Sequence, residues 1–229
     1  MALILCVETS STNCSVALAS DAVEGNTASS YQVIHCLDFI EDNSSSYSHG
    51  ERLHVFIDDL LKRNNFTVQD LDAIAVSEGP GSYTGLRIGV ASVKGMCYAL
   101  NIPMIAINTL ESLSLQNRSD TDYTISMLDA RRMEVYAAVY HGKELIETTS
   151  AVILDEDSFS RFRESGTITF IGTGVEKFEN LIKESAHQYV TSNPTAITMC
   201  DTAVLKYKKS DTVDVAYFEP FYLKEFKAG

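Results

Sequence analysis

Short apolar runs alternate with polar turns along the first half of the chain, and longer stretches between them have apolar residues at helical spacing. The runs predict strands and the longer stretches predict helices, in the order β-β-β-α-β-α-β-α. The expected strands cover residues 3–7, 14–19, 31–40, 73–77 and 104–108, and the expected helices cover 49–63, the part of 78–100 after its glycine-rich turn, and 110–115. A strand, a glycine-rich turn, a helix and a strand in succession over 73–108 indicate a βαβ unit.

The second half of the chain begins the same scheme again. Its expected elements are strands at 124–128, 133–140, 143–154 and 167–172, helices at 155–165, 175–184 and 194–208, and an extended aromatic-rich tail at 217–226. Both halves open with a strand, an acidic turn and a returning strand, with Glu8 in the first turn and Asp129 in the second. The repeated scheme indicates an internal duplication, and the polar junction at 117–122 predicts two subdomains, 1–118 and 119–229.

The helix within 78–100 has an unusual composition. Three glycines lie inside it, and each costs about 1 kcal/mol relative to alanine. On a helical wheel these glycines form a smooth strip with two other small residues; the strip consists of Gly85, Gly89, Ser92, Gly95 and Ala99. A bulky apolar stripe lies beside it, and the narrow arc left for solvent holds Arg87, Ala91, Lys94 and Tyr98. A helix that is apolar over most of its circumference is buried on more than one side. We therefore expect this helix to pack on the sheet with one side and against the backbone of a second element with the other.

The turn before this helix offers chemistry of its own. Gly79, Gly81 and Gly85 allow backbone conformations that other residues avoid, and Ser82 and Thr84 can cap the helix start. Free N–H groups at a helix start favour anions. The spacing matches neither a Walker A loop nor the dinucleotide-binding glycine pattern. The sequence therefore leaves a purely structural turn and a ligand-contacting turn as alternatives.

Composition narrows the classes of function. The chain has 229 residues, a formal net charge of −13 and a pI near 4.7, which opposes autonomous binding of nucleic acid. Its five cysteines are odd in number and have no metal-ligand spacing, so we expect reduced, buried thiols in a cytoplasmic protein. No apolar stretch reaches membrane-spanning length, and the start enters a strand pattern without a basic leader region, so we expect neither a membrane segment nor a signal peptide.

Several motifs together resemble the TsaB family, formerly grouped with YeaZ-type glycoproteases. GPGSYTGLRIG at 79–89 is similar to the signature of that family, and DARRMEVYAA at 129–138 is similar to its second signature. The opening ILCVETSSTNCSVAL, the HGE helix start at 49–51 and the ending PFYLK at 220–224 also match in order. Lys224 stands where the family usually has arginine. The resemblance spans nearly the whole chain.

The resemblance implies an α/β fold that is actin-like and sugar-kinase-like, with two ribonuclease-H-like subdomains. It also implies a role in forming N6-threonylcarbamoyladenosine at position 37 of tRNAs that read ANN codons. In that family TsaB is a non-catalytic partner that forms a heterodimer with the related transferase TsaD, and the ATPase TsaE joins them. By this resemblance the chain alone forms a homodimer, binds no cofactor tightly and reaches tRNA through the complex, where ATP or ADP is a candidate ligand.

A comparison of motifs argues against the chain being the catalytic relative. TsaD has an HxxxH metal motif after the strand that corresponds to 104–108, and histidines four apart can ligate one metal. Here those positions hold Thr109 and Leu113. A hydroxyl and an alkyl group cannot replace two imidazoles, so we expect a pseudoenzyme subunit without a metal.

The resemblance also places a partner-binding surface on the 49–63 helix and the glycine-containing helix. The residues expected at this interface are Leu53, Phe56, Ile57, Leu60, Gly85, Gly89, Ser92, Met96 and Ala99. The candidate polar contacts, to a nucleotide or across the interface, are Ser82, Thr84 and Arg87.

An alternative function is that of an ATP-dependent phosphotransferase of the actin-like fold. It would use Glu8, Thr9, Asp129 and the glycine turn at 172–174 as the lining of one cleft. Glu8 stands where the TsaB family usually has aspartate, and its extra methylene would displace a tightly placed carboxylate. Proteolysis, which the old family label suggests, lacks a recognisable catalytic constellation in this sequence.

Overall fold

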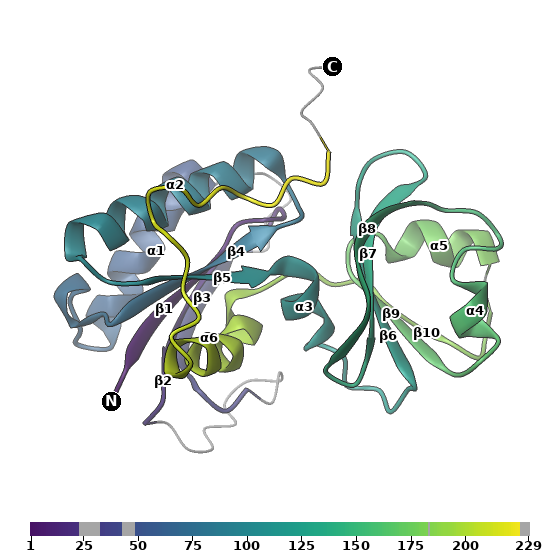
Figure 1. The fold of residues 1–229 in the computed structure, drawn as a ribbon, viewed down its shortest axis with the longest axis horizontal. Helices are drawn as coiled ribbons and strands as arrows, with labels where there is room; N and C mark the ends of the chain where they lie inside the picture. The colour runs from purple at the N-terminus through teal and green to yellow at the C-terminus, as the bar shows by residue number, and fades with distance from the viewer. Residues whose placement is uncertain (23–32, 43–48, 183, 225–229) are drawn as a thin grey trace. The chain divides into compact units, whose positions relative to one another are not determined.

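The computed structural model describes residues 1–22, 33–42, 49–182 and 184–224, which form two compact units (Figure 1). The first unit comprises the described residues of Met1–Thr109 and Pro194–Tyr222. The second comprises those of Leu110–Asn193, together with Leu223 and Lys224. Each unit is built on one five-stranded sheet.

The sheet of the first unit has the order β3-β2-β1-β4-β5. Its strands are β1 (Leu3–Glu8), β2 (Cys14–Ser20), β3 (Cys36–Asp42), β4 (Ala73–Gly79) and β5 (Met104–Asn108). The first three strands are antiparallel, and β4 and β5 run parallel to β1. The expected strands at 3–7, 14–19, 73–77 and 104–108 are confirmed.

Helices cover both faces of this sheet (Figure 1). On one face lie α1 (His49–Arg63) and α2 (Tyr83–Leu100), while the short η2 (Ala196–Met199) and α6 (Cys200–Lys208) lie on the other. The alternation of side chains along β1 explains the two layers, since Leu3, Leu5 and Val7 pack toward α1 and α2 while Ile4 and Cys6 pack toward α6. A 3-10 turn, η1 (Val68–Asp70), precedes β4, and α3 (Thr109–Ser114) follows β5.

The second sheet repeats the topology of the first. Its strands are β6 (Tyr123–Asp129), β7 (Glu134–His141), β8 (Glu144–Ile153), β9 (Ile168–Ile171) and β10 (Gln188–Val190). The order β8-β7-β6-β9-β10 is again third, second, first, fourth and fifth, with the first three strands antiparallel and the others parallel to the first. The short α4 (Ser160–Arg163) and α5 (Val175–Ile182) complete the unit. The expected duplication is therefore present at the level of topology.

Several expected boundaries differ from the observed ones. The third strand begins at Cys36 rather than at residue 31, and residues 31 and 32 lie outside the described part. The helix expected at 155–165 is reduced to α4, because the Ser158 hydroxyl pairs with Asp155 in a turn and Phe159 has a left-handed φ of 60°. The helix expected at 194–208 divides into η2 and α6, and the three-residue β10 was not expected at all.

The division into units also differs from the expected subdomains, 1–118 and 119–229. The segment Pro194–Tyr222 belongs to the first unit and not to the second. The physical reason is that η2 and α6 bury apolar side chains against the first sheet, among them Ile197, Met199, Ala203 and Val204.

The final part of the first unit is a C-terminal strap, residues 213–222, which runs along α2 (yellow in Figure 1). Val213 N–H donates to the Met104 carbonyl at 2.9 Å, and Phe221 N–H donates to the Glu78 carbonyl at 2.7 Å. Between these ends the Lys94 ammonium of α2 donates to two strap carbonyls, at 3.1 and 2.8 Å. The strap therefore closes over α2 and buries part of that helix.

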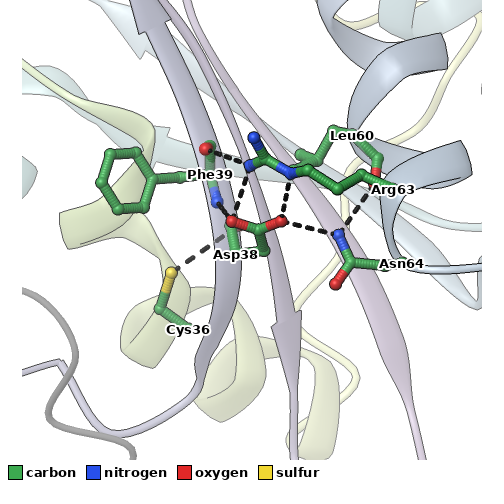
Figure 2. A network of polar contacts seen from close by, with 6 residues as sticks. All are labelled: Cys36, Asp38, Phe39, Leu60, Arg63 and Asn64. Atoms are coloured by element: carbon green, nitrogen blue, oxygen red, sulfur yellow. Dashed lines mark hydrogen bonds and ion pairs between the residues drawn. The ribbon is translucent and has the colours of Figure 1, made fainter.

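A carboxylate clamp joins the end of α1 to the edge strand β3 (Figure 2). Arg63 donates to both oxygens of Asp38, from Nε and Nη2, each at 2.7 Å, and Asn64 Nδ2 donates at 2.8 Å. Burial raises the pKa of Asp38, but the hydrogen bonds from Arg63, Asn64 and the Phe39 main chain outweigh that effect and lower it. The clamp fixes α1 over the sheet.

Candidate functional site

The glycine-rich turn delivers the chain from β4 into α2. Gly79 has a φ of 113°, a conformation that favours glycine. Ser82 is the N-cap, and its hydroxyl accepts a hydrogen bond from Gly85 N–H at 3.3 Å. Thr84 lies exposed in the first turn of α2. Of the two expected caps, only Ser82 acts as one.

The tip of the β1–β2 hairpin closes directly onto this turn. Ser82 N–H donates to the Ser10 carbonyl at 2.6 Å, and the Thr9 hydroxyl donates to the Gly85 carbonyl at 2.9 Å. A Cβ atom added at Gly85 would lie 2.0 Å from the Thr9 carbonyl oxygen, and one at Gly89 would lie 2.2 Å from Thr9 Oγ1. Both glycines are therefore needed for the approach of the chain's own hairpin.

This packing answers the question of what meets the smooth strip of α2. The second backbone near Gly85 and Gly89 belongs to Thr9 in the same chain, so these two buried glycines do not lie on the surface where the interface was expected. Gly95 differs, because it is exposed and no described atom lies within 4 Å of the position that its Cβ would take. Only the later part of the strip faces outward.

The start of α1 meets the same hairpin. His49 is buried, and its Nε2 lies 2.8 Å from the Ser11 carbonyl. Burial lowers the pKa of His49, although the Ser11 contact and the Asp42 charge oppose the shift. His49 Cδ2 also lies 3.3 Å from the Cβ position of Gly85. The HGE motif and the glycine signature therefore both secure the hairpin tip between the starts of two helices.

Glu8 occupies the end of β1 at the base of this hairpin and is fully buried. Its Oε1 accepts hydrogen bonds from Ser10 N–H at 2.6 Å and from the Ser77 hydroxyl at 3.0 Å. Its Oε2 has no hydrogen-bond partner among the described residues. Burial raises the pKa of Glu8, against the lowering effect of its hydrogen bonds. The arrangement suits a carboxyl group that braces the hairpin.

The residues expected at a partner interface fall into two groups. Leu53, Ile57 and Leu60 lie in the core of the first unit because they form the stripe of α1 that packs on the sheet. The other expected contacts are at least partly exposed: Phe56, Ser92, Met96 and Ala99. The second group is the part of the expected interface that has exposed surface in this structure, and the interface itself stays a prediction.

The outward side of α2 combines small residues with one large aromatic residue. We call this surface the α2 outer face and define it as Ala91, Gly95, Tyr98 and Ala99, all of which are exposed. The Tyr98 side chain is 84% exposed, and Val55 of the neighbouring α1 is 53% exposed. The helical wheel had assigned Ala91 and Tyr98 to the solvent arc and Gly95 and Ala99 to the glycine strip, so this surface combines residues of both.

Arg87, a candidate polar contact, is held at the start of α2 by an aromatic stack. Its guanidinium carbon lies 4.6 Å from the centroid of the Tyr83 ring, within cation–π range. Tyr83 in turn packs on Tyr222 of the strap, with ring centroids 4.9 Å apart. The PFYLK ending therefore supports the glycine signature, while Arg87 remains exposed.

The expected residues of the second unit have structural partners within that unit. Asp129 ends β6 and accepts hydrogen bonds from Arg131 N–H at 2.6 Å and from Lys177 Nζ at 2.7 Å. A Cβ at Gly172 would lie 2.2 Å from the Met127 carbonyl oxygen. Glycine is thus required there by close packing between β6 and the turn before α5. Lys224, which follows the strap, pairs with Glu134.

The two positions compared with the HxxxH motif are both in α3. Thr109 begins the helix and is buried, while Leu113 packs in a core cluster of the second unit with Leu110, Leu128 and Ile171. In the part of the chain that the structure covers, no group of three or more His, Cys, Asp or Glu residues is arranged to hold a metal ion. None of the described helices is long and apolar enough to cross a membrane.

Comparisons with known proteins agree with the motifs. A family model described as TsaD, tRNA N6-adenosine threonylcarbamoyltransferase, matches residues 42–218. The chain is 29% identical over 235 residues to the tRNA threonylcarbamoyladenosine biosynthesis protein TsaB of Escherichia coli, covering 96% of this chain and 94% of that protein. It is 38% identical over 96 residues to the Bacillus subtilis protein of the same name, which is 42% of each chain.

The fold has a counterpart among solved structures. The structure of YeaZ from Pseudomonas aeruginosa superimposes with a TM-score of 0.76 at 24% identity, over 97% of this chain and all of that one. The match shows that the chain shares the fold of that protein. The chain therefore belongs to the TsaB/YeaZ family, within the wider family that the threonylcarbamoyltransferase model describes, and has the α/β fold of YeaZ.

Proposed function

We propose that this chain acts in the biosynthesis of tRNA threonylcarbamoyladenosine as a non-catalytic subunit that binds and activates the transferase TsaD. The product would be N6-threonylcarbamoyladenosine at position 37 of ANN-decoding tRNAs. The observation that supports the pathway most is similarity over nearly the full length of a TsaB protein whose name states this biosynthesis.

The α2 outer face is the proposed docking surface for TsaD. Its small residues let a partner approach the helix closely, and Tyr98 supplies a large aromatic side chain that is almost fully exposed. Aromatic residues on a rigid element are enriched among the residues that dominate binding energy. Phe56 of α1 and Ser92 and Met96 of α2 are partly exposed and extend the proposed surface toward α1.

We base the proposed non-catalytic role of this chain on Thr109 and Leu113, which stand where the metal motif of TsaD has histidines. Leu113 is fully buried in an apolar cluster with Leu110 and Ile171, and an imidazole there would lose that packing. A buried polar ring without partners is costly. This chain would therefore leave the metal-dependent chemistry to the partner.

The net charge of −13 supports an indirect role toward tRNA. A protein that held tRNA by itself would need clustered Lys and Arg residues to neutralise phosphates. We therefore assign tRNA binding to the complex that includes TsaD and the ATPase TsaE. In that complex Arg87, exposed and stacked on Tyr83, is the residue of this chain that we propose contacts a nucleotide or a partner carboxylate.

The docking proposal is tested with TsaD from the same organism, by light scattering after size-exclusion chromatography and by isothermal titration. Tyr98→Glu introduces a charge into the α2 outer face, and Ile153→Glu introduces the same charge at a 73%-exposed position of β8 in the second unit. We expect a heterodimer with the unmodified chain and with Ile153→Glu, and at least a tenfold loss of affinity with Tyr98→Glu. Equal affinity of both variants would contradict the docking surface, and absence of any complex with the unmodified chain would contradict the proposed function.

A further inference from the structure

The C-terminal strap presents one large aromatic side chain to solvent. Its inward side chains Val213, Val215 and Phe218 are partly buried and pack against the core cluster that the first sheet shares with α1 and α2. Tyr217 points the other way and is 86% exposed. A single exposed apolar side chain is ordinary on a protein surface, so the surroundings of Tyr217 decide whether it marks a binding site.

The backbone that carries Tyr217 is held by hydrogen bonds on both sides of the ring. Asp214 Oδ1 accepts hydrogen bonds from Ala216 N–H at 2.8 Å and from Tyr217 N–H at 3.2 Å, and the Asp214 carbonyl accepts one from Phe218 N–H at 2.9 Å. Lys94 of α2 donates to the Ala216 and Phe218 carbonyls, which flank Tyr217 in the sequence. The ring therefore stands on an ordered turn, and a partner that covers it has little backbone freedom to remove.

The contacts of Lys94 also place Tyr217 beside an exposed row of α2 (Figure 1). Arg87 lies about two helical turns before Lys94, and Tyr98 lies about one turn after it, so the three residues share one side of the helix. Arg87 is exposed, and Tyr98 is 84% exposed. One arginine and two tyrosines thus line the boundary between the strap and the α2 outer face.

The other tyrosine of the strap provides a contrast. Tyr222 packs on Tyr83 with ring centroids 4.9 Å apart, so its ring is used within the chain. The Tyr217 ring has no comparable contact with another described residue, and its exposure leaves both of its faces open to a partner. Its substitution should therefore have little effect on stability, because changes at exposed positions without partners are usually small.

We propose that Tyr217 is a second anchor of the surface that binds TsaD, so that the strap and the α2 outer face form one continuous interface. This proposal rests on the proposed function, because it takes TsaD as the occupant of the α2 outer face. Continuity supports the same occupant, since Tyr98 belongs to that face and Tyr217 stands beside it, next to Lys94.

The composition of the boundary suits a protein partner. Tyrosine and arginine are enriched at the positions that dominate the binding energy of protein interfaces. A tyrosine supplies a large contact area and has only two side-chain torsions to fix, so its burial costs little conformational entropy. Two such rings on separate segments, Tyr98 on a helix and Tyr217 on the strap, define the orientation of a partner more closely than one ring can.

The test is isothermal titration of TsaD from the same organism with variants of the full chain. Tyr217→Glu should raise the Kd by about tenfold or more, and Tyr217→Ala should raise it by about fivefold or more. Ile153→Glu, which places the same charge at an exposed position of β8, should leave the Kd unchanged. Hydrogen-exchange mass spectrometry should show the same amide protection of the strap in Tyr217→Ala as in the unmodified chain.

The possible failures are distinguishable. Weaker binding by Tyr98→Glu together with unchanged binding by both Tyr217 variants would overturn this inference and leave the proposed function intact. No complex between TsaD and the unmodified chain would overturn both. Lost affinity that accompanies faster exchange along the strap would make Tyr217 a structural residue and overturn its role as an anchor. A homodimer that Tyr217→Glu dissociates without a change in TsaD affinity would assign the ring to a second copy of the chain and would overturn it as well.

Discussion

Substitution of Gly85 by alanine tests whether close packing of the β1–β2 hairpin is the reason that α2 has glycine at position 85. The added Cβ would lie 2.0 Å from the Thr9 carbonyl oxygen, and ordinary contacts are 3.4 Å or more, so the hairpin backbone must retreat by more than 1 Å. Overpacking of this kind costs about 1–3 kcal/mol. Retreat also breaks the hydrogen bond from the Thr9 hydroxyl to the Gly85 carbonyl, worth about 1 kcal/mol.

Helix propensity acts in the opposite direction and is measured by a matched control. Gly95→Ala is in the same helix, is exposed and meets no described atom within 4 Å. It should therefore keep the full gain of about 0.8–1 kcal/mol that alanine has over glycine. Gly85→Ala receives the same gain but bears the steric cost, so it should be net destabilising by about 1–3 kcal/mol.

The assay is urea denaturation of both variants and the unmodified chain, followed by far-ultraviolet circular dichroism. Gly95→Ala should raise the free energy of unfolding and Gly85→Ala should lower it, with a difference of about 2–4 kcal/mol between the variants. In thermal unfolding about 1 kcal/mol corresponds to roughly 2–4 °C for a chain of this size. Equal effects of the two substitutions would refute the hairpin contact as the reason for glycine at position 85.

Three further outcomes are expected. Gly89→Ala should destabilise the unmodified chain more than it destabilises the Thr9→Ala variant, because the added Cβ atom meets Thr9 Oγ1. A double-mutant cycle from urea denaturation should give a coupling free energy of about 1 kcal/mol, and additive effects of the two substitutions would contradict the contact. Asp38→Asn should lower the free energy of unfolding by about 1–2 kcal/mol at pH 7. Because the folded pKa of Asp38 is lowered, this difference from the unmodified chain should have its full size above about pH 5 and should shrink as the pH falls below about 4. Asp58→Asn, which removes an exposed ion pair, should have little effect in the same titration. Lys94→Met should speed amide exchange in the strap, measured by hydrogen-exchange mass spectrometry, and unchanged exchange there would contradict the role of its two hydrogen bonds.

The sequence predicted the elements with strong periodicity well. The helix at 49–63 and the strand at 104–108 have the expected bounds. A regular apolar stripe is compatible only with a helix, and a short apolar run between turn residues favours a strand. The duplicated order of elements was likewise visible. The three-residue β10 and the four-residue α4 were not predictable in this way, because they are too short for any period to appear.

The candidate site shows where helical wheels stop being informative. The helical wheel placed Gly85 and Gly89 on one strip of small residues. The residue that packs against them, Thr9, lies 76 residues before Gly85 in the sequence. Such a pairing follows from the parallel placement of β1 beside β4, which no local pattern specifies. Burial of the α1 stripe on the sheet was similarly beyond the wheel, whereas the exposure of Tyr98 followed from it.

The most direct test of the proposed role is reconstitution of tRNA modification with TsaD and TsaE from the same organism, an unmodified ANN-decoding tRNA and a threonylcarbamoyl donor. The tRNA is digested to nucleosides, and N6-threonylcarbamoyladenosine is quantified by mass spectrometry with the chain present, omitted or replaced by Tyr98→Glu. We predict at least a tenfold fall in product on omission and on substitution, with Ile153→Glu fully active. Product formed equally well without the chain would contradict its role as an activating subunit.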